Sequence, residues 1–333
     1  MTIHINAAFD SGNIRLTGID GDTVDLEIVP DHQSDFYQWF HFRVAGARGR
    51  RLTFRITNAG SAAYAFGWPG YKARVSSDRE AWRLTDGHYA DGVFSFSHAF
   101  DGDVAWFAYF APYSMERHAD LIARMAAQPG VTHRELGQTL DGRAIDLLML
   151  GDGPKQVWLY ARQHPGESMA EWWMEGALEK LTDPDDTAAQ ALRAKATFHI
   201  VPNMNPDGSF RGHLRTNAAG VNLNREWHSP TLEKSPEVVH VRNAMDATGV
   251  DFAIDVHGDE DAGHDDVAQR HERHHVFREG GDALDAAEDD EGQGDREDGA
   301  GDGGVDAGRR LEALGDRVGL HARQHHAGGV NGG

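Results

Sequence analysis

The sequence predicts an α/β protein in which an antiparallel β-sandwich precedes a mixed, largely parallel α/β domain. Two observations lead to this prediction. Residues 1 to about 112 contain short runs of alternating apolar and polar side chains, separated by turns rich in Gly and Asp, as in an antiparallel sandwich. From Ser114 onward, strand-like runs alternate with helical patterns, which is typical of a sheet with parallel strands. We therefore place a sandwich domain in residues 1–113 and an α/β domain in residues 114–260.

Composition restricts the classes of partner. The chain has 333 residues, a formal net charge of −21 and no cysteine. The negative charge argues against nucleic acid or an anionic membrane as a partner. Without cysteine there is no disulfide, and a bound zinc ion would need nitrogen and oxygen ligands. The first residues lack a secretory signal and no run approaches the length of a membrane span, so we expect a cytoplasmic protein.

The first domain reads as a series of short strands. We expect these strands near residues 14–16, 24–28, 52–56, 93–96 and 104–110. Between them lies a group of aromatic residues, namely Trp39, Phe40, Phe42, Tyr64, Phe66 and Trp68. We interpret this group as the core of the sandwich, with a ligand-binding aromatic surface as the alternative.

The second domain begins with a helix whose capped start is at Ser114 and whose end is at Pro129-Gly130. A hairpin should follow, turning at Asp141-Gly142 between strands 131–140 and 144–150. The remaining expected elements are strand 157–161, helices 168–181 and 187–195, strand 197–201, a turn-rich loop at 202–208 and strand 251–256.

The chain changes character after Glu260. Residues 261–333 form an acidic tail rich in Gly, Asp, His and Arg, in which only residues 309–320 have helical spacing of apolar side chains. Such a composition buries too little apolar surface to offset the entropy lost on ordering. We therefore predict that the tail is disordered or arises from a shifted reading frame, which sequencing the DNA across codon 260 would test. The tail histidines that we interpret as solvated are His264, His271, His274 and His275.

Three side chains are candidate metal ligands. His164 and Glu167 follow the buried strand 157–161, and His257 follows strand 251–256. Because ligand sites in open α/β sheets lie at the carboxyl ends of the strands, these groups can converge at one edge. Two His and one Glu form a zinc set that leaves a coordination position open. A solvated loop is the alternative for the His-x-x-Glu triplet alone.

A polar segment at 211–227 supplies the remaining candidates. Arg215, Asn224 and Arg225 would cluster near the proposed cation. A guanidinium fork binds a carboxylate through two hydrogen bonds, so together these residues suggest an anionic ligand. Each arginine taken alone is also compatible with a solvated surface position.

Five short motifs occur along residues 164–258, namely HPGE at 164–167, NPDG at 205–208, GHLR at 212–215, GVNLNR at 220–225 and DVHG at 255–258. Through these motifs residues 1–260 resemble the zinc carboxypeptidases of the carboxypeptidase A type, and most closely the cytosolic carboxypeptidase branch with its N-terminal β-sandwich. The resemblance implies that residues 114–260 are the N-terminal portion of a catalytic domain. It also implies hydrolysis of the C-terminal peptide bond of a peptide or protein tail.

The resemblance further implies a role for each matching residue. His164, Glu167 and His257 would bind one zinc ion. Asn224 and Arg225 would hold the terminal carboxylate of the substrate, and Arg215 would polarise the scissile carbonyl and stabilise the oxyanion. Asn222 stands where many members have an Asp that braces a zinc-bound histidine.

One part of the family pattern has no counterpart that we can assign. The family's general base is a Glu on a late strand, preceded by a Tyr on a mobile loop, and this region falls in the tail. The tail has no tyrosine. Its glutamates without a strand context are Glu272, Glu279, Glu288, Glu291, Glu297 and Glu312. Losing a general base costs about 10² to 10⁴ in rate, so we expect this chain to be nearly inactive. Without the late strands of the family, a sheet edge and apolar faces would be exposed, so we also expect the chain to be poorly stable.

Two other functions fit the same residues. One is a zinc amidohydrolase acting on N-acyl amino acids, which would share the His-x-x-Glu and His set. The other is a non-catalytic module that binds zinc or a peptide. The long N-terminal sandwich and the Asn224-Arg225 pair favour the peptidase.

Overall fold

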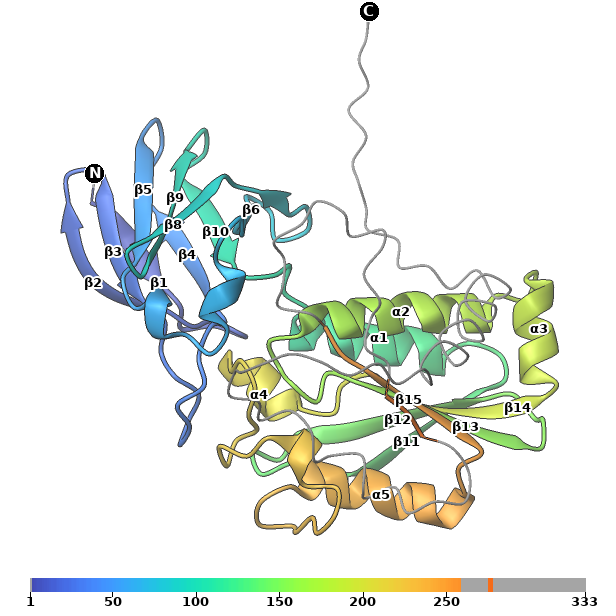
Figure 1. The fold of residues 1–333 in the computed structure, drawn as a ribbon. Helices are drawn as coiled ribbons and strands as arrows, with labels where there is room; N and C mark the ends of the chain where they lie inside the picture. Colours follow the sequence, from blue (N-terminus) through green and yellow to red (C-terminus); the bar gives the residue numbers. More distant parts are fainter. Residues whose placement is uncertain (1, 259–274, 278–333) are drawn as a thin grey trace, which may run out of the picture.

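The computed structural model describes residues 2–258 and 275–277, and it contains three β-sheets (Figure 1). Two sheets form the N-terminal sandwich, and the third carries helices on both faces. The predicted fold class is confirmed. No helix in these residues is both long and apolar enough to span a membrane.

The sandwich consists of two five-stranded sheets. The first sheet has, in spatial order, β1 (His4–Asn6), β4 (His41–Ala45), β10 (Val104–Ala108), β6 (Arg74–Ser76) and β7 (Arg83–Leu84). The second has β2 (Arg15–Asp20), β3 (Thr23–Glu27), β5 (Arg51–Ile56), β9 (Val93–Ala99) and β8 (Gly87–Ala90). Every strand pair is antiparallel except β3 with β5, which is parallel. Two short 3₁₀ turns, η1 (Ala59–Ser61) and η2 (Ala65–Gly67), lie between β5 and β6.

Aromatic side chains fill the space between the two sheets. Four of the six residues predicted for the core are fully buried there, namely Trp39, Phe40, Phe42 and Trp68. The prediction is wrong for Phe66, whose side chain is 69% exposed. Phe66 lies in η2 rather than in a strand, so no sheet face directs it inward. Tyr64, just before η2, is partly buried and faces the second domain.

The α/β domain is built on a six-stranded mixed sheet. Its strands are, in spatial order, β11 (Val131–Gln138), β12 (Ala144–Leu150), β14 (Ala196–Val201), β13 (Lys155–Ala161), β15 (Phe252–Val256) and β16 (His275–Phe277). Only the β14–β13 and β13–β15 pairs are parallel. The parallel character predicted from the sequence is thus confined, in the described residues, to the three central strands.

Helices cover both faces of this sheet. They are α1 (Met115–Ala126), α2 (Ser168–Thr182), α3 (Thr187–Arg193), α4 (Pro206–Arg211) and α5 (Pro236–Thr248), with a 3₁₀ turn η3 (Leu223–Arg225). Figure 1 shows α1 and α2 on one face of the sheet and α5 on the other. Separate apolar clusters fill the two faces.

Most of the predicted elements are confirmed. Ser114 caps α1 by accepting a hydrogen bond from the Arg117 N–H, and the 131–150 hairpin turns at Gly142 in the left-handed region. The loop predicted at 202–208 is wrong in part, since α4 begins at Pro206. The Asn205 side chain caps that helix and offsets the unfavourable turn residues that follow.

Only residues 275–277 of the 261–333 segment are among the described residues. Strand β16 pairs with β15 in antiparallel fashion, which the composition of the tail did not suggest. The helical spacing at 309–320 and the predictions of disorder or a shifted reading frame fall outside the described residues.

A buried ionic network joins α1 to α2 and to β12. His118 on α1 is 4% exposed, and its Nδ1 and Nε2 lie 2.6 Å from Glu171 Oε1 and 3.1 Å from Asp146 Oδ2. Burial alone would lower the pKa of His118, but the two carboxylates outweigh it and raise the pKa from 6.5 to about 9. The imidazolium therefore stabilises the fold fully below about pH 6.5, and this contribution disappears as the pH rises through about 9.

The network predicts a pH dependence of stability. Between pH 6.5 and 9, the free energy of unfolding should fall by about 3 kcal/mol more in the wild type than in His118→Gln, as measured by urea titration. His88 is exposed, so His88→Gln should keep the wild-type profile. Parallel profiles for the wild type and His118→Gln would contradict the assignment.

Candidate metal centre

The centre lies where two neighbouring parallel strands end. β13 pairs with β15 so that Ala161 is opposite Val256. The segments that follow these two strands therefore leave the sheet at the same edge. Arg162 adopts a left-handed backbone conformation, with a φ of 59°, which turns the chain directly after β13. The Arg162 side chain is fully buried, and its Nε donates a hydrogen bond of 3.0 Å to the Pro165 carbonyl. The arginine therefore fixes the turn that follows it.

This arrangement brings together the three candidate ligands predicted from the sequence. One ligand atom from each of His164, Glu167 and His257 can be chosen so that all three atoms lie within 4.8 Å of one another. The Nδ1 atom of His164 is 2.6 Å from Glu167 Oε1, and the Nδ1 atom of His257 is 2.9 Å from Glu167 Oε2. Glu167 is 3% exposed and His164 is 4% exposed.

The electrostatics of the cluster favour charged groups. Burial alone would raise the pKa of Glu167, but the adjacent imidazoles of His164 and His257 lower it well below its ordinary value. Burial alone would lower the pKa of His257, but hydrogen bonds to Asp255 and Glu167 raise it to about 10. The carboxylate is thus held as an anion inside the protein, where it requires a positive partner.

A second set of groups holds the far sides of the two rings. His164 Nε2 lies 3.1 Å from Asn222 Oδ1, and His257 Nε2 lies 2.8 Å from Asp255 Oδ2. Both oxygens accept hydrogen bonds, so each ring presents Nδ1 toward the centre. The expected contact between Asn222 and a histidine of the centre is present. Such contacts orient metal-binding histidines and make them better ligands.

The residues present fit a zinc ion. Two imidazole nitrogens and a carboxylate converge in a buried position, and the outer nitrogens of both rings are already engaged. Nitrogen and oxygen donors in this ratio suit zinc and leave a position free for water or substrate.

The other residues predicted for the site, Arg215, Asn224 and Arg225, lie in the segment 211–227 next to the centre. Arg215 is half-buried, and its guanidinium contacts the sandwich, with Nη1 donating to the Tyr64 hydroxyl. Asn224 and Arg225 lie in η3, and the Asn224 N–H donates to Asn222 Oδ1 at 3.1 Å. Arg225 is exposed, and its guanidinium donates a hydrogen bond of 3.3 Å to the Asn224 carbonyl. The six tail glutamates lie outside the described residues.

Sequence reasoning did not identify Asp255 as a partner of the centre. It stands two residues before His257, and in a strand such residues share a face, so this spacing could have revealed it. The contacts of Arg215 with Tyr64 and Phe36 were also missed. These residues are far apart in the sequence, and no local pattern connects them.

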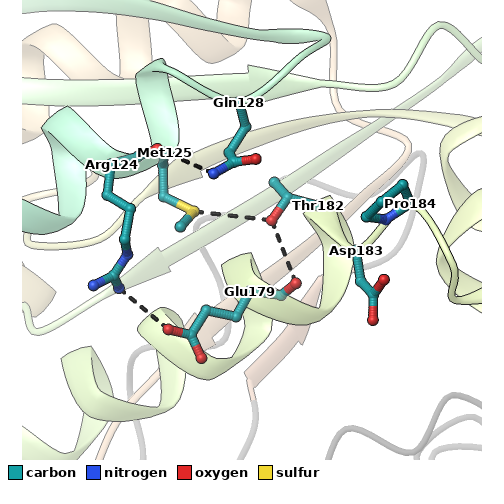
Figure 2. A pocket seen from close by; sticks show the side chains of 7 residues that line it. All are labelled: Arg124, Met125, Gln128, Glu179, Thr182, Asp183 and Pro184. Carbon is teal, nitrogen blue, oxygen red and sulfur yellow. Dashed lines mark hydrogen bonds and ion pairs between the residues drawn. The ribbon is translucent and has the colours of Figure 1, made fainter.

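A surface hollow of about 330 Å³ lies elsewhere in the domain (Figure 2). It is formed at the C-terminal ends of α1 and α2, where Arg124 pairs with Glu179 at 3.2 Å. The three candidate ligands are near the opposite end of α2, about 20 Å away for a helix of this length. The hollow is therefore separate from the centre.

The fold and the centre together define a two-domain α/β protein with a candidate zinc site. Comparison with known families agrees with this description. Residues 5–110 match the cytosolic carboxypeptidase N-terminal domain, and residues 118–279 match the zinc carboxypeptidase family.

Relatives extend the match over most of the chain. An uncharacterized protein of Zymomonas mobilis is 61% identical over 260 residues, covering 78% of this chain and 68% of that protein. Mouse cytosolic carboxypeptidase 1 is 31% identical over 294 residues, covering 73% of this chain but only 24% of the mouse protein. The chain thus spans about a quarter of the length of the mouse relative.

Solved structures show the same arrangement. A metallo-carboxypeptidase from Burkholderia cenocepacia is 45% identical with a TM-score of 0.76, covering 78% of this chain and 72% of that one. A metallo-carboxypeptidase from Pseudomonas aeruginosa, in complex with (2-guanidinoethylmercapto)succinic acid, is 46% identical with a TM-score of 0.76, covering 78% and 71%. The chain belongs to the zinc carboxypeptidase family, and its first domain is of the cytosolic carboxypeptidase type.

The centre predicts the effect of removing each ligand. Replacing His164, Glu167 or His257 with Ala should weaken zinc binding by more than about 100-fold, because changes to groups that only support a ligand already cost 10- to 100-fold. The measurement is competition with a chromophoric chelator at one zinc per chain. His228→Ala, at an exposed histidine on the same domain, should leave the affinity unchanged. An unchanged affinity in any of the three ligand variants would remove that residue from the site.

Proposed function

We propose that this protein is a zinc-dependent metallocarboxypeptidase that uses one ion and acts on the C-terminal peptide bond of peptides or protein tails. The observation that carries the proposal is the buried cluster of two imidazoles and one carboxylate at the ends of β13 and β15. Membership of the zinc carboxypeptidase family supports it. When bound, zinc would supply Lewis acidity for the scissile carbonyl and would lower the pKa of water.

The residues around the cluster have separate roles in this proposal. His164, Glu167 and His257 hold the ion, while Asn222 and Asp255 keep the rings oriented. Arg225, with Asn224, binds the terminal carboxylate of the substrate. The exposed guanidinium of Arg225 suits this role, because it makes no ion pair with another described residue that a substrate would have to displace.

Arg215 has the second electrostatic role. Its guanidinium would donate hydrogen bonds to the oxygen of the scissile carbonyl, where negative charge develops during hydrolysis. The Leu214 carbonyl accepts a hydrogen bond of 2.9 Å from the Gly166 N–H, so the backbone beside Arg215 is joined to the turn that carries Glu167.

The proposal predicts recognition of a free C-terminal carboxylate. The zinc-loaded 333-residue chain should bind a peptide with a free carboxylate more tightly than the same peptide with a C-terminal amide. Arg225→Met should reduce this preference by about 10- to 100-fold, which is the contribution of hydrogen bonds to a charged group. Isothermal titration calorimetry gives both affinities.

The control for this experiment is Arg134→Met. Arg134 is exposed on β11, so this variant loses the same charge away from the centre and should keep the preference. Equal binding of the acid and the amide by the wild type would contradict the proposed role of Arg225.

We also propose that turnover by this chain is impaired, because no residue can be assigned as the general base. Replacing residues 261–333 with the corresponding part of the Zymomonas mobilis relative should raise release of the C-terminal residue by about 10² to 10⁴. Comparable turnover by the unaltered chain would contradict the impairment.

The same chimera separates the alternative functions. Faster hydrolysis of an N-acyl amino acid than of a peptide would indicate an amidohydrolase. Tight binding of zinc and peptide without turnover would indicate a non-catalytic module. The proposed function predicts release of C-terminal residues from the peptide.

A further inference from the structure

Asp31, in the sandwich domain, accepts hydrogen bonds from the backbone of the α/β domain at and next to Arg215. Asp31 is buried, with 3% of the residue exposed. Oδ1 accepts a hydrogen bond of 2.6 Å from the Leu214 N–H, and Oδ2 accepts one of 2.8 Å from the Arg215 N–H. The N–H and hydroxyl of Thr216 also donate to Oδ2, at 2.9 Å and 3.0 Å. Hydrogen bonds to an ionised carboxylate are strong, so one buried side chain fixes three consecutive residues.

The Arg215 side chain is held by the same domain. Its Nη1 donates a hydrogen bond to the Tyr64 hydroxyl. Its guanidinium carbon lies 5.4 Å from the centre of the Phe36 ring and 5.8 Å from that of the Tyr64 ring. Contact with the face of an aromatic ring attracts a cation, so the hydroxyl and the two rings together restrict the orientation of the guanidinium.

The backbones of the two domains also meet closely on this loop. Gly212 and Gly220 have φ angles of 71° and 74°, which disfavour a side chain. A Cβ atom at Gly212 would lie 2.8 Å from the Ser11 carbonyl oxygen, and one at Gly220 would lie 2.7 Å from the Gln33 carbonyl oxygen. At these two positions loop 212–220 lies too close to the sandwich backbone to accommodate a side chain.

Leu214 connects this interface to the metal centre. Its side chain is 2% exposed and packs into the apolar core of the sandwich. Its carbonyl accepts the hydrogen bond from the Gly166 N–H, one residue before Glu167. A Cβ atom at Gly166 would lie 2.9 Å from that carbonyl oxygen, so the two segments are in close contact. The position of the sandwich is thus coupled both to Arg215 and to residues 162–167, the turn after β13 that carries His164 and Glu167 and is called the ligand turn below.

We propose that Asp31 and Tyr64 are positioning residues supplied by the sandwich domain, which hold Arg215 in the orientation that binds the oxygen of the scissile carbonyl. The inference rests on the proposed function, because it takes the role of Arg215 from it. Asp31 fixes the backbone from which Arg215 extends, and Tyr64 fixes the guanidinium itself. The sandwich is then a part of the active site rather than a separate accessory domain.

Tyr64→Phe gives the sharpest test, because it removes one hydroxyl and keeps the ring. The zinc-loaded full chain is titrated with two peptide analogues that share a sequence and a free C-terminal carboxylate. One has a phosphinate in place of the scissile amide, whose oxygens resemble the hydrated carbonyl. The other has a –CH₂–NH– group there and no such oxygen. Tyr64→Phe should weaken binding of the phosphinate by about 3- to 10-fold and leave binding of the reduced analogue unchanged.

Two further variants make the test specific to Arg215. In an Arg215→Met background, Tyr64→Phe should cause no additional loss, since the two residues act through one contact. Tyr37→Phe is the matched control, because the Tyr37 hydroxyl donates to the Asn58 carbonyl within the sandwich. This control should bind both analogues as the wild type does. Asp31→Asn should weaken phosphinate binding by about 10-fold while zinc affinity is retained.

The outcomes separate this inference from the proposed function. Equal losses for both analogues in Tyr64→Phe would show a purely structural role, and no loss for either would show no role; each result overturns the inference while the proposed function stands. If the wild-type chain with bound zinc binds neither analogue, the proposed function fails and the inference fails with it. Should Asp31→Asn not fold, the Tyr64→Phe result decides alone.

Discussion

The parallel pairing of β13 with β15 is the constraint on which the candidate site depends. It places Ala161 opposite Val256, so that the segments after the two strands run side by side. His164 and His257 consequently lie with ring centres 4.8 Å apart, on either side of one buried carboxylate. A carboxylate in such a position is stable only with positive charge beside it, from protonated imidazoles or from a cation. The pairing of the two strands therefore also places the imidazoles where the buried carboxylate needs positive charge.

The surroundings of the ligand turn are rigid for a related reason. The Arg162 guanidinium, buried behind the turn, donates to Glu171 at 2.7 Å and to the Tyr113 carbonyl at 2.9 Å. Glu171 also contacts His118, so the turn is tied through α2 to α1. On its other side the turn contacts Leu214, which is packed into the sandwich. Buried polar groups with their partners satisfied specify one arrangement, which is what a site with fixed ligand geometry requires.

The features predicted correctly from the sequence are those that depend on neighbouring residues, such as apolar runs and short motifs. The strand ends that carry His164 and His257 were found because apolar runs stop there, and Asn222 was found through its motif. The exposure of Phe66 was missed because composition does not distinguish a short turn from a strand. Asp31 and Tyr64 could not have been assigned, since their contacts with residues 214–216 join positions more than 150 apart in the chain. Only the docking of the two domains creates those contacts.

We infer that two histidines and one carboxylate hold a single zinc ion. X-ray absorption spectroscopy at the zinc edge, on the full chain with one equivalent of zinc, reports the ligands of the metal. We expect two imidazole ligands and oxygen ligands, all at about 2.0–2.2 Å. A spectrum that requires three or four imidazoles would place the metal among other histidines of the chain and would contradict the assignment.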